Sequence, residues 1–176
     1  NEKKTIPFRL PIQWVNRPNS NFRGFSGLVA SGSIDVGDKI RIHPGGQESS
    51  IESIVTWDGV ISQAEEGQSI TITLNDKIDV SRGDVIATTQ DPCGEADQFQ
   101  SRILWMSNDP MIPGRQYILK SNTQSATVTL GKLKYRIDVN TMNPIPAKKL
   151  SLNEIGVCNI SLDKRIAFDK YEQNQT

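Results

Sequence analysis

Residues 8–27 read FRLPIQWVNRPNSNFRGFSG, and this stretch decides the fold class. An apolar, strand-like run over residues 8–15 is followed by the turn-forming sequence Asn-Arg-Pro-Asn at 16–19, and a second run begins at Phe22. Asn, Pro and Gly between short apolar runs are typical of strands joined by tight connections. The stretch therefore predicts paired β-strands at the start of the chain.

The rest of the chain repeats this pattern of short alternating runs bounded by Gly, Pro, Asn and Asp. Almost no window places apolar residues at helical spacing, whereas residues 70–74, Ile-Thr-Ile-Thr-Leu, alternate with period two as a strand requires. The sequence therefore predicts an all-β protein. Strands are expected near residues 8–15, 24–34, 38–43, 50–57, 68–75, 84–89, 98–106, 116–121, 124–139, 154–163 and 166–171.

A turn-rich stretch, TQDPCGEAD at residues 89–97, interrupts the strands and predicts a domain boundary. We expect two small antiparallel β-barrels in tandem, one over residues 1–92 and one over residues 93–176. Within the second barrel, the apolar residues Val128 and Leu130 occupy even positions, whereas Leu133 occupies an odd one. This change in the alternation predicts a β-bulge at Gly131. In the first, Asp58-Gly59 is expected to occupy the two central positions of a hairpin turn.

Charge and cysteine content limit the classes of function. Lys plus Arg and Asp plus Glu both number 20, which gives a net charge of zero and none of the basic surplus usual in nucleic-acid-binding proteins. The two cysteines, Cys93 and Cys158, are too few for a disulfide framework and are interpreted as free thiols in a reducing compartment. No signal peptide and no long apolar run is found, so we expect a cytoplasmic location.

Catalytic and cofactor motifs are not found in the sequence. The phosphate-binding pattern of glycine, four residues and Gly-Lys-Ser/Thr does not occur. His43 is the one histidine and lies in a predicted hairpin tip with no second catalytic group implied. Asp76, Asp79 and Asp84 surround a strand junction, where turn chemistry explains carboxylates better than a cation site. We therefore predict no catalytic, cofactor-binding or metal-binding residue in this chain.

Two arginines stand out as candidate contact residues. Arg17 and Arg23 flank the short segment after the first strand, and paired guanidinium groups can clamp a carboxylate, a phosphate or an acidic edge of a partner. Ordinary solvated charge is the alternative. The tryptophans Trp14, Trp57 and Trp105 can serve as stacking surfaces, but core packing is the favoured interpretation for each.

The amino-acid sequences of several segments resemble those of one protein family. QWVNRP, FRGFSG, KIDVSRGDVIAT, SRILWMSNDPMIPGRQYILK, LKYRIDVNT and IAFDKYEQNQT are similar to the GTPase (large) subunit of bacterial two-subunit sulfate adenylyltransferase, within the translation-factor GTPase superfamily. The resemblance covers the whole chain. It implies a barrel like the second domain of translation factors, followed by a barrel like their third domain that lacks its last strand.

This resemblance also implies a role. Such a subunit hydrolyses GTP to drive a small catalytic subunit, which makes adenosine phosphosulfate and pyrophosphate from ATP and sulfate. The two barrels would be a non-catalytic fragment, with GTP and magnesium bound in a GTPase domain that precedes them. The implied partners are that domain and the small subunit, and Arg17 and Arg23 are possible interdomain or subunit contacts.

Two other classes of function remain open at this point. A translation elongation factor-like GTPase would use the barrels to bind RNA, which predicts a basic groove. A free-standing β-barrel binding module would need a complete second barrel. The zero net charge disfavours the first, and the expected lack of a final strand disfavours the second.

Overall fold

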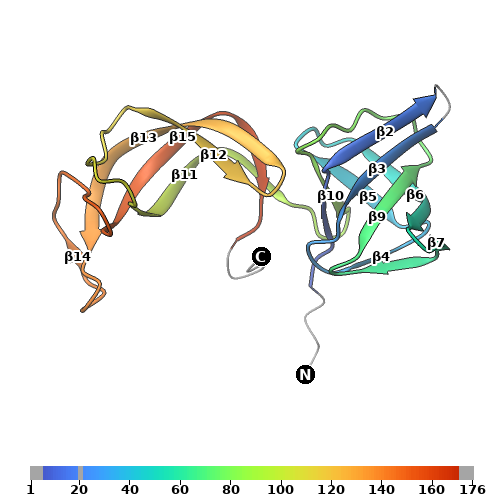
Figure 1. Ribbon diagram of the computed structural model, residues 1–176, viewed down its shortest axis with the longest axis horizontal. Coiled ribbons are helices and arrows are strands. Elements are labelled where there is room, and N and C mark those ends of the chain that lie inside the picture. Colours follow the sequence, from blue (N-terminus) through green and yellow to red (C-terminus); the bar gives the residue numbers. More distant parts are fainter. Residues whose placement is uncertain (1–5, 20–21, 171–176) are drawn as a thin grey trace. The chain divides into compact units, whose positions relative to one another are not determined.

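The computed structural model describes residues 6–19 and 22–170, and all regular structure in these ranges is β-strand (Figure 1). The all-β prediction is confirmed. The described residues hold no helix of the length and apolar character needed to span a membrane. They divide into two compact units. Unit 1 takes in the described residues up to Glu95, then Ser121–Gln124, and those from Ile166 onward, and unit 2 takes in Ala96–Lys120 and Ser125–Arg165.

Unit 1 is built on an antiparallel sheet in the order β1-β10-β5-β6-β9-β3-β2, with β7 paired to β6 and a separate pair formed by β4 and β8. The short runs between turn residues form these strands, as their alternating burial requires. The bounds are β1 Arg9–Pro11, β2 Trp14–Asn19, β3 Phe22–Leu28, β4 Ser33–Asp35, β5 Lys39–His43, β6 Glu48–Thr56, β7 Gly59–Ile61, β8 Gln63–Glu65, β9 Ser69–Leu74 and β10 Val85–Thr88.

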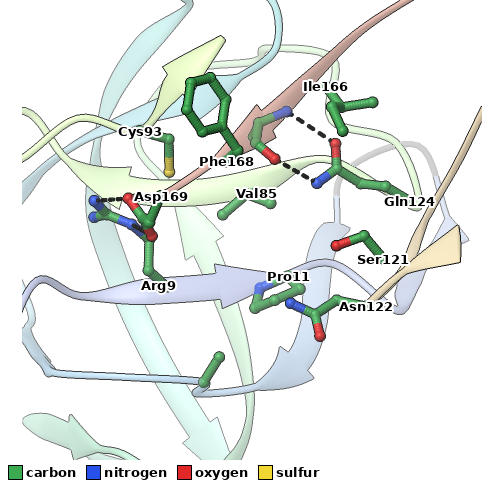
Figure 2. Close-up of a pocket in the computed structure, with 12 residues that line it drawn as sticks. Arg9, Pro11, Val85, Cys93, Ser121, Asn122, Gln124, Ile166, Phe168 and Asp169 are labelled. Carbon is green, nitrogen blue, oxygen red and sulfur yellow. Dashed lines mark hydrogen bonds and ion pairs between the residues drawn. The ribbon is translucent and has the colours of Figure 1, made fainter. Parts of the chain in front are cut away.

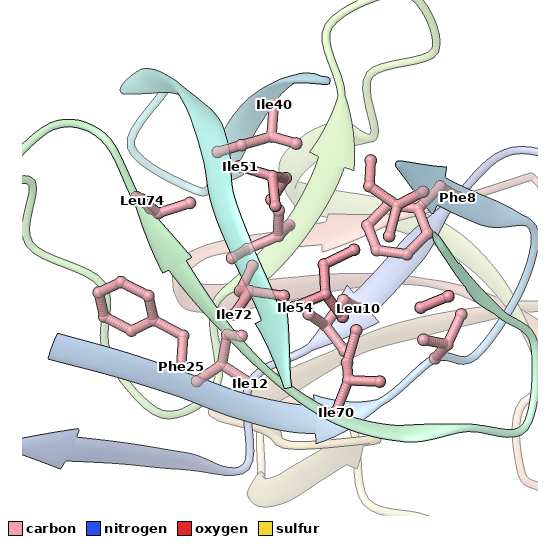
Figure 3. Close-up of a cluster of buried hydrophobic side chains, with 14 of the residues drawn as sticks. Phe8, Leu10, Ile12, Phe25, Ile40, Ile51, Ile54, Ile70, Ile72 and Leu74 are labelled. Carbon is pink, nitrogen blue, oxygen red and sulfur yellow. The ribbon is translucent and has the colours of Figure 1, made fainter. Parts of the chain in front are cut away.

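The sheet of unit 1 closes into a barrel through β1. This strand pairs with β10 on one side, and on the other the Arg9 N–H donates to the Ser31 carbonyl at 3.0 Å while the Ala30 N–H donates to the Arg9 carbonyl at 2.8 Å. The inward-facing residues of the strands fill the interior, for which Ile70, Ile72 and Leu74 of β9 are an example (Figure 3). Closure removes most sheet edges and encloses the main core cluster of this unit, and a smaller cluster contains Val85, Ala87, Cys93 and Ala167.

Gly27 permits the closing strands to approach each other. A Cβ added at this residue would lie 2.3 Å from the Pro11 carbonyl oxygen and 3.0 Å from a methyl carbon of Leu10. Contacts that short do not occur between real side chains and backbone, so only glycine fits here. The second glycine of FRGFSG is therefore a packing requirement of the barrel.

Two local predictions in unit 1 are wrong. Residues 16–19 were expected to form a turn, but they continue β2, and the connection to β3 falls at residues 20–21, outside the described residues. The Asp58-Gly59 pair was expected at the centre of a hairpin turn, but Gly59 pairs with Thr56, so the turn residues are Trp57 and Asp58. Only Gly59 of the pair has a positive φ, 126°.

Unit 2 contains most of a second antiparallel sheet, in the order β11-β15-β13-β12 with β14 paired to β13. The predicted bulge at Gly131 is confirmed, because the register of β13 against β15 shifts between Leu130 and Leu133. A Cβ at Gly131 would lie 2.7 Å from the Asn159 carbonyl oxygen. The bounds are β11 Gly94–Leu104, β12 Gln116–Ser121, β13 Gln124–Ile137, β14 Pro144–Ile145 and β15 Ile155–Phe168.

The core of unit 2 is smaller than that of unit 1. Its fully buried members include Leu150 and Cys158, and partly buried aromatic residues surround them. Among these, the Trp105 and Tyr117 rings pack edge to face with centroids 5.7 Å apart, and the Trp105 indole N–H donates to the Asp109 carbonyl at 2.7 Å. The predicted boundary between residues 92 and 93, and the expected lack of a last strand, stay predictions.

Candidate functional site

The structure brings the two predicted contact arginines to one carboxylate. Arg17 lies in β2 and Arg23 in β3, and their Nη atoms lie 3.6 and 3.3 Å from the same Asp79 oxygen. All three side chains are exposed, with 84% of the Asp79 side chain accessible. Ion pairs this exposed contribute little stability, so the arginines remain available for exchange to another acidic group. Sequence reasoning could not predict this pairing, because Asp79 follows Arg23 by 56 residues.

A surface groove of about 390 Å³ lies beside this cluster. One wall consists of residues from the start of β2, including Trp14 and Arg17, and the other of Val80, Ser81 and Arg82. Trp14 was expected to pack in the core, but it is 65% exposed, because Val15 is the residue of this pair that packs against the barrel interior. Trp57, expected in the core as well, is 99% exposed at its hairpin turn.

A second feature, which sequence reasoning missed, is a buried arginine at the barrel closure. Arg9 is 5% exposed. Its Nε and Nη2 donate to the two carboxylate oxygens of Asp169, each at 2.8 Å (Figure 2). Its Nη1 donates to the carbonyls of Phe8 and Asp91. Burial acts to lower the pKa of Arg9, but the hydrogen bond to Asp169 and the neighbouring negative charges raise it overall. The guanidinium is a permanent cation held entirely by protein acceptors.

The same region holds the side-chain amide of Gln124 against the backbone of Ala167. The Gln124 Nε2 donates to the Ala167 carbonyl and the Ala167 N–H donates to the Gln124 Oε1, both at 3.0 Å and both buried (Figure 2). This reciprocal pair replaces the two hydrogen bonds of a neighbouring strand. Together, the contacts of Arg9 and Gln124 bind residues 166–169 into unit 1, and we call this arrangement the C-terminal clasp.

A pocket of about 170 Å³ lies within the clasp, lined in part by Arg9, Cys93, Asn122 and Phe168. Burial raises the pKa of the Cys93 thiol to about 11, with the charge of Arg9 opposing this effect. At neutral pH the thiol is therefore protonated and a poor nucleophile. Four of the five N–H groups of the Arg9 guanidinium donate to protein acceptors, so this side chain serves the packing of the clasp.

His43 has a partner that the sequence did not indicate. Its ring is 2% exposed, and Nδ1 lies 2.7 Å from an oxygen of Glu95, which follows it by 52 residues. The expectation of a solitary histidine at a hairpin tip is thus wrong. A carboxylate can only accept, so Nδ1 carries a proton in this contact. The other ring nitrogen, Nε2, is buried without a hydrogen-bond partner among the described residues.

The acidic residues near the strand junction serve local structure. Asp76 accepts a hydrogen bond from the Ser49 hydroxyl, and Asp84 accepts one from the Ser81 N–H, in keeping with the turn interpretation. Within residues 6–19 and 22–170, no group of three or more His, Cys, Asp or Glu side chains is arranged to hold a metal ion.

Comparison with known proteins gives relatives that match both units. The chain is 45% identical to sulfate adenylyltransferase subunit 1 of Aliarcobacter butzleri (strain RM4018) over 99% of its own length and 37% of that protein. It is 44% identical to the same subunit of Methylorubrum extorquens (strain PA1), again over 99% and 37%. It is 45% identical to the bifunctional enzyme NodQ of Rhizobium sp. (strain BR816), over 96% of the chain and 27% of that protein. The chain thus spans 27–37% of the length of these relatives.

Solved structures agree on the fold. The structure of sup35 complexed with GDP matches this chain with a TM-score of 0.84 at 18% sequence identity. The match covers 96% of this chain and 42% of the sup35 chain. Translation elongation factor SelB from Methanococcus maripaludis, in its apo form, matches with a TM-score of 0.74 at 15% sequence identity. This match covers 93% of this chain and 37% of the SelB chain. These similarities establish the tandem barrels of translation-factor GTPases as the fold.

The family comparison agrees with this assignment for the second half. Residues 98–176 match the family described as GTP-eEF1A C-terminal domain-like. The relatives that are 44–45% identical to this chain over 99% of its length extend that match across unit 1 as well. Over both of its units, the chain matches a part of sulfate adenylyltransferase subunit 1 that makes up 37% of that protein's length.

Proposed function

We propose that this chain is the non-catalytic β-barrel portion of the GTP-hydrolysing subunit of sulfate adenylyltransferase. The enzyme forms adenosine phosphosulfate and pyrophosphate from ATP and sulfate. The observation that carries the proposal is the 44–45% identity to sulfate adenylyltransferase subunit 1 over 99% of the chain, which includes both units.

In this proposal the barrels relay the nucleotide state and perform no chemistry. The sequence has no phosphate loop, so GTP and magnesium bind in a GTPase domain of the same subunit. Movement of rigid domains is the usual way in which such a state reaches a distant site. The partners are that GTPase domain and the small catalytic subunit, and the reaction takes place in the cytoplasm.

Arg17 and Arg23 are proposed as contacts to the GTPase domain or to the catalytic subunit. Their exposure and their shared, weakly held Asp79 support this role, because both guanidinium groups can turn to a new carboxylate without breaking a buried interaction. A contact that becomes buried on assembly is far stronger than the exposed pair seen here.

The test uses the full-length subunit together with its catalytic partner. We expect GTP to stimulate formation of adenosine phosphosulfate, and Arg17→Ala or Arg23→Ala to weaken subunit affinity or stimulation by about 2–5 kcal/mol if the contact is desolvated. Melting temperatures should be unchanged, since the pairs with Asp79 are exposed. Arg102→Ala, an exposed arginine in β11, is the matched control.

Two outcomes would count against these proposals, and they can be told apart. A complete subunit that gives no GTP-dependent sulfate activation with any small adenylyltransferase subunit would refute the function. Normal stimulation and affinity in both arginine variants would refute only the contact role. The RNA-binding alternative predicts salt-sensitive tRNA affinity for the isolated chain, which its equal numbers of acidic and basic residues do not favour.

A further inference from the structure

The surface groove beside Trp14 borders a strand edge that is open. β2 is the last strand in the order of the unit 1 sheet, and none of the other described strands pairs with its outer side. An edge of this kind presents unpaired backbone N–H and C=O groups, which can bind another extended chain. The outer side of β2 is therefore a strand edge of unit 1 that is available for pairing.

The groove begins just after Ile12, the last residue before β2 that forms backbone hydrogen bonds with the segment opposite. Ile12 still exchanges hydrogen bonds with the chain opposite, since its N–H donates to the Asp84 carbonyl at 2.8 Å and its carbonyl accepts from the Gly83 N–H at 3.0 Å. Beyond Ile12 the two segments line opposite walls of the groove, residues 13–17 on one side and 80–82 on the other. An added strand would enter the groove beyond Ile12 and continue along β2.

The length available for pairing is limited by the sequence. Pro18 lacks a backbone N–H, so it cannot donate to an added strand, and prolines on edge strands commonly restrict pairing in this way. The open segment that retains both donors and acceptors is therefore Trp14–Arg17. A strand of about four residues can pair here, at roughly 3.4 Å of rise per residue.

The walls of the groove favour an acidic occupant with an apolar side chain. Arg17 and Arg82 stand on opposite walls and both are exposed. Arg82 forms no ion pair within the described ranges, and Arg17 has only its 3.6 Å contact to the largely exposed Asp79. The indole ring of Trp14, 65% exposed, supplies the apolar surface of the groove.

We propose that this groove binds an extended acidic peptide segment of a protein partner by strand addition to β2. Backbone pairing with Trp14–Arg17 holds the segment, carboxylates meet Arg17 and Arg82, and an intervening apolar side chain covers Trp14. This inference goes beyond the proposed function, because it specifies a mode of recognition that the isolated chain performs whatever its parent enzyme does.

The test uses the 176-residue chain and a defined peptide, acetyl-Glu-Val-Asp-Val-Glu-Val-Asp-amide. We expect binding that shifts the backbone amide resonances of residues 13–17 and 80–82 and the indole resonance of Trp14, and that leaves the resonances of Trp57 and Trp105 unchanged. The same peptide with N-methyl groups on alternate backbone nitrogens should not bind, because it keeps the charge and loses the donors needed for strand pairing.

Variants separate the charge contribution from the fold. Arg82→Ala and Arg17→Ala should each weaken the acidic peptide about fivefold, the size expected of an exposed ion pair, while Arg102→Ala leaves it unchanged. A peptide with Lys in place of each acidic residue should bind less than the acidic one. Failure of the acidic peptide to bind, equal binding of the N-methylated peptide, or preference for a single-stranded thymidine oligonucleotide of equal charge would each overturn the proposal.

Discussion

The Arg9 guanidinium and the Asp169 carboxylate, 160 residues apart in the sequence, meet through two hydrogen bonds of 2.8 Å each. The contact is bidentate, and the two side chains are 6% and 15% exposed. Because Arg9 belongs to the strand that closes the first barrel, the C-terminal clasp fixes the end of β15 to the beginning of the chain. A buried pair of this kind is sensitive to the loss of either member.

We expect Asp169→Ala to lower the free energy of unfolding by about 3 kcal/mol, because it leaves the Arg9 cation buried without its counter-charge. The double variant Arg9→Met with Asp169→Leu should recover part of that loss, since it removes both charges. Glu48→Gln, which removes the exposed Arg41–Glu48 pair, is the control and should cost less than about 1 kcal/mol. Denaturant unfolding measures all three, and equal losses for Asp169→Ala and Glu48→Gln would contradict the prediction.

Gln124→Leu should cost about 2 kcal/mol, because it leaves both the N–H and the C=O of Ala167 buried without a partner. The local effect is a faster hydrogen exchange at the Ala167 amide. Gln116→Leu, at an exposed position of β12, is the matched control. An Ala167 amide that stays as protected in Gln124→Leu as in the wild type would show that the side-chain amide does not hold this segment.

Gly27→Ala should destabilise unit 1 by about 2–3 kcal/mol, since the new methyl group overlaps the Pro11 carbonyl oxygen. The Gln13 N–H, which donates to the Ser26 carbonyl at 2.9 Å across the same closure, should exchange faster. At Gly37 an added Cβ meets open space, so Gly37→Ala carries only the backbone cost of its φ of +93°. Comparable exchange at Gln13 in both variants would argue against the packing role of Gly27.

The Cys93 thiol makes the free energy of unfolding depend on pH in the alkaline range. Its pKa is about 11 in the folded chain against an ordinary 9.0. Below pH 9 both folded and unfolded states hold the proton. As pH rises from 9 to 11, the unfolded state loses it first and stability falls, by up to about 3 kcal/mol. Cys93→Ala should lose this part of the pH dependence and Cys158→Ala should keep it, and identical pH profiles for wild type and Cys93→Ala would refute the assignment.

The parts of the fold that were predicted correctly are those that the local alternation of apolar and polar residues determines. The alternation over Ile70–Leu74 and the phase change at Gly131 both reflect which side of a strand is buried, and that information lies in neighbouring residues. The predicted run 116–121 matches β12 for the same reason. The error at residues 16–19 arose because Asn and Pro favour turns, whereas an edge strand also tolerates them.

The ion-pair and hydrogen-bond partners of the polar side chains could not be predicted from neighbouring residues in the sequence. Asp79, Glu95 and Asp169 reach their arginine or histidine partners from 52 to 160 residues away, and nothing near either member of a pair signals the other. Arg9 reads as an ordinary polar residue between Phe8 and Leu10. It is buried only because barrel closure and the return of residues 166–169 enclose it.

The C-terminal clasp also sets an order of events during synthesis. A ribosome makes Arg9 160 residues before Asp169, so the arginine of the nascent first barrel exists before its counter-ion does. The closing strand can pair with β10 before then, but residues 166–169 complete the first barrel only after unit 2 has been made. Translation that stops before Asp169 would release a barrel that holds an uncompensated arginine at its closure.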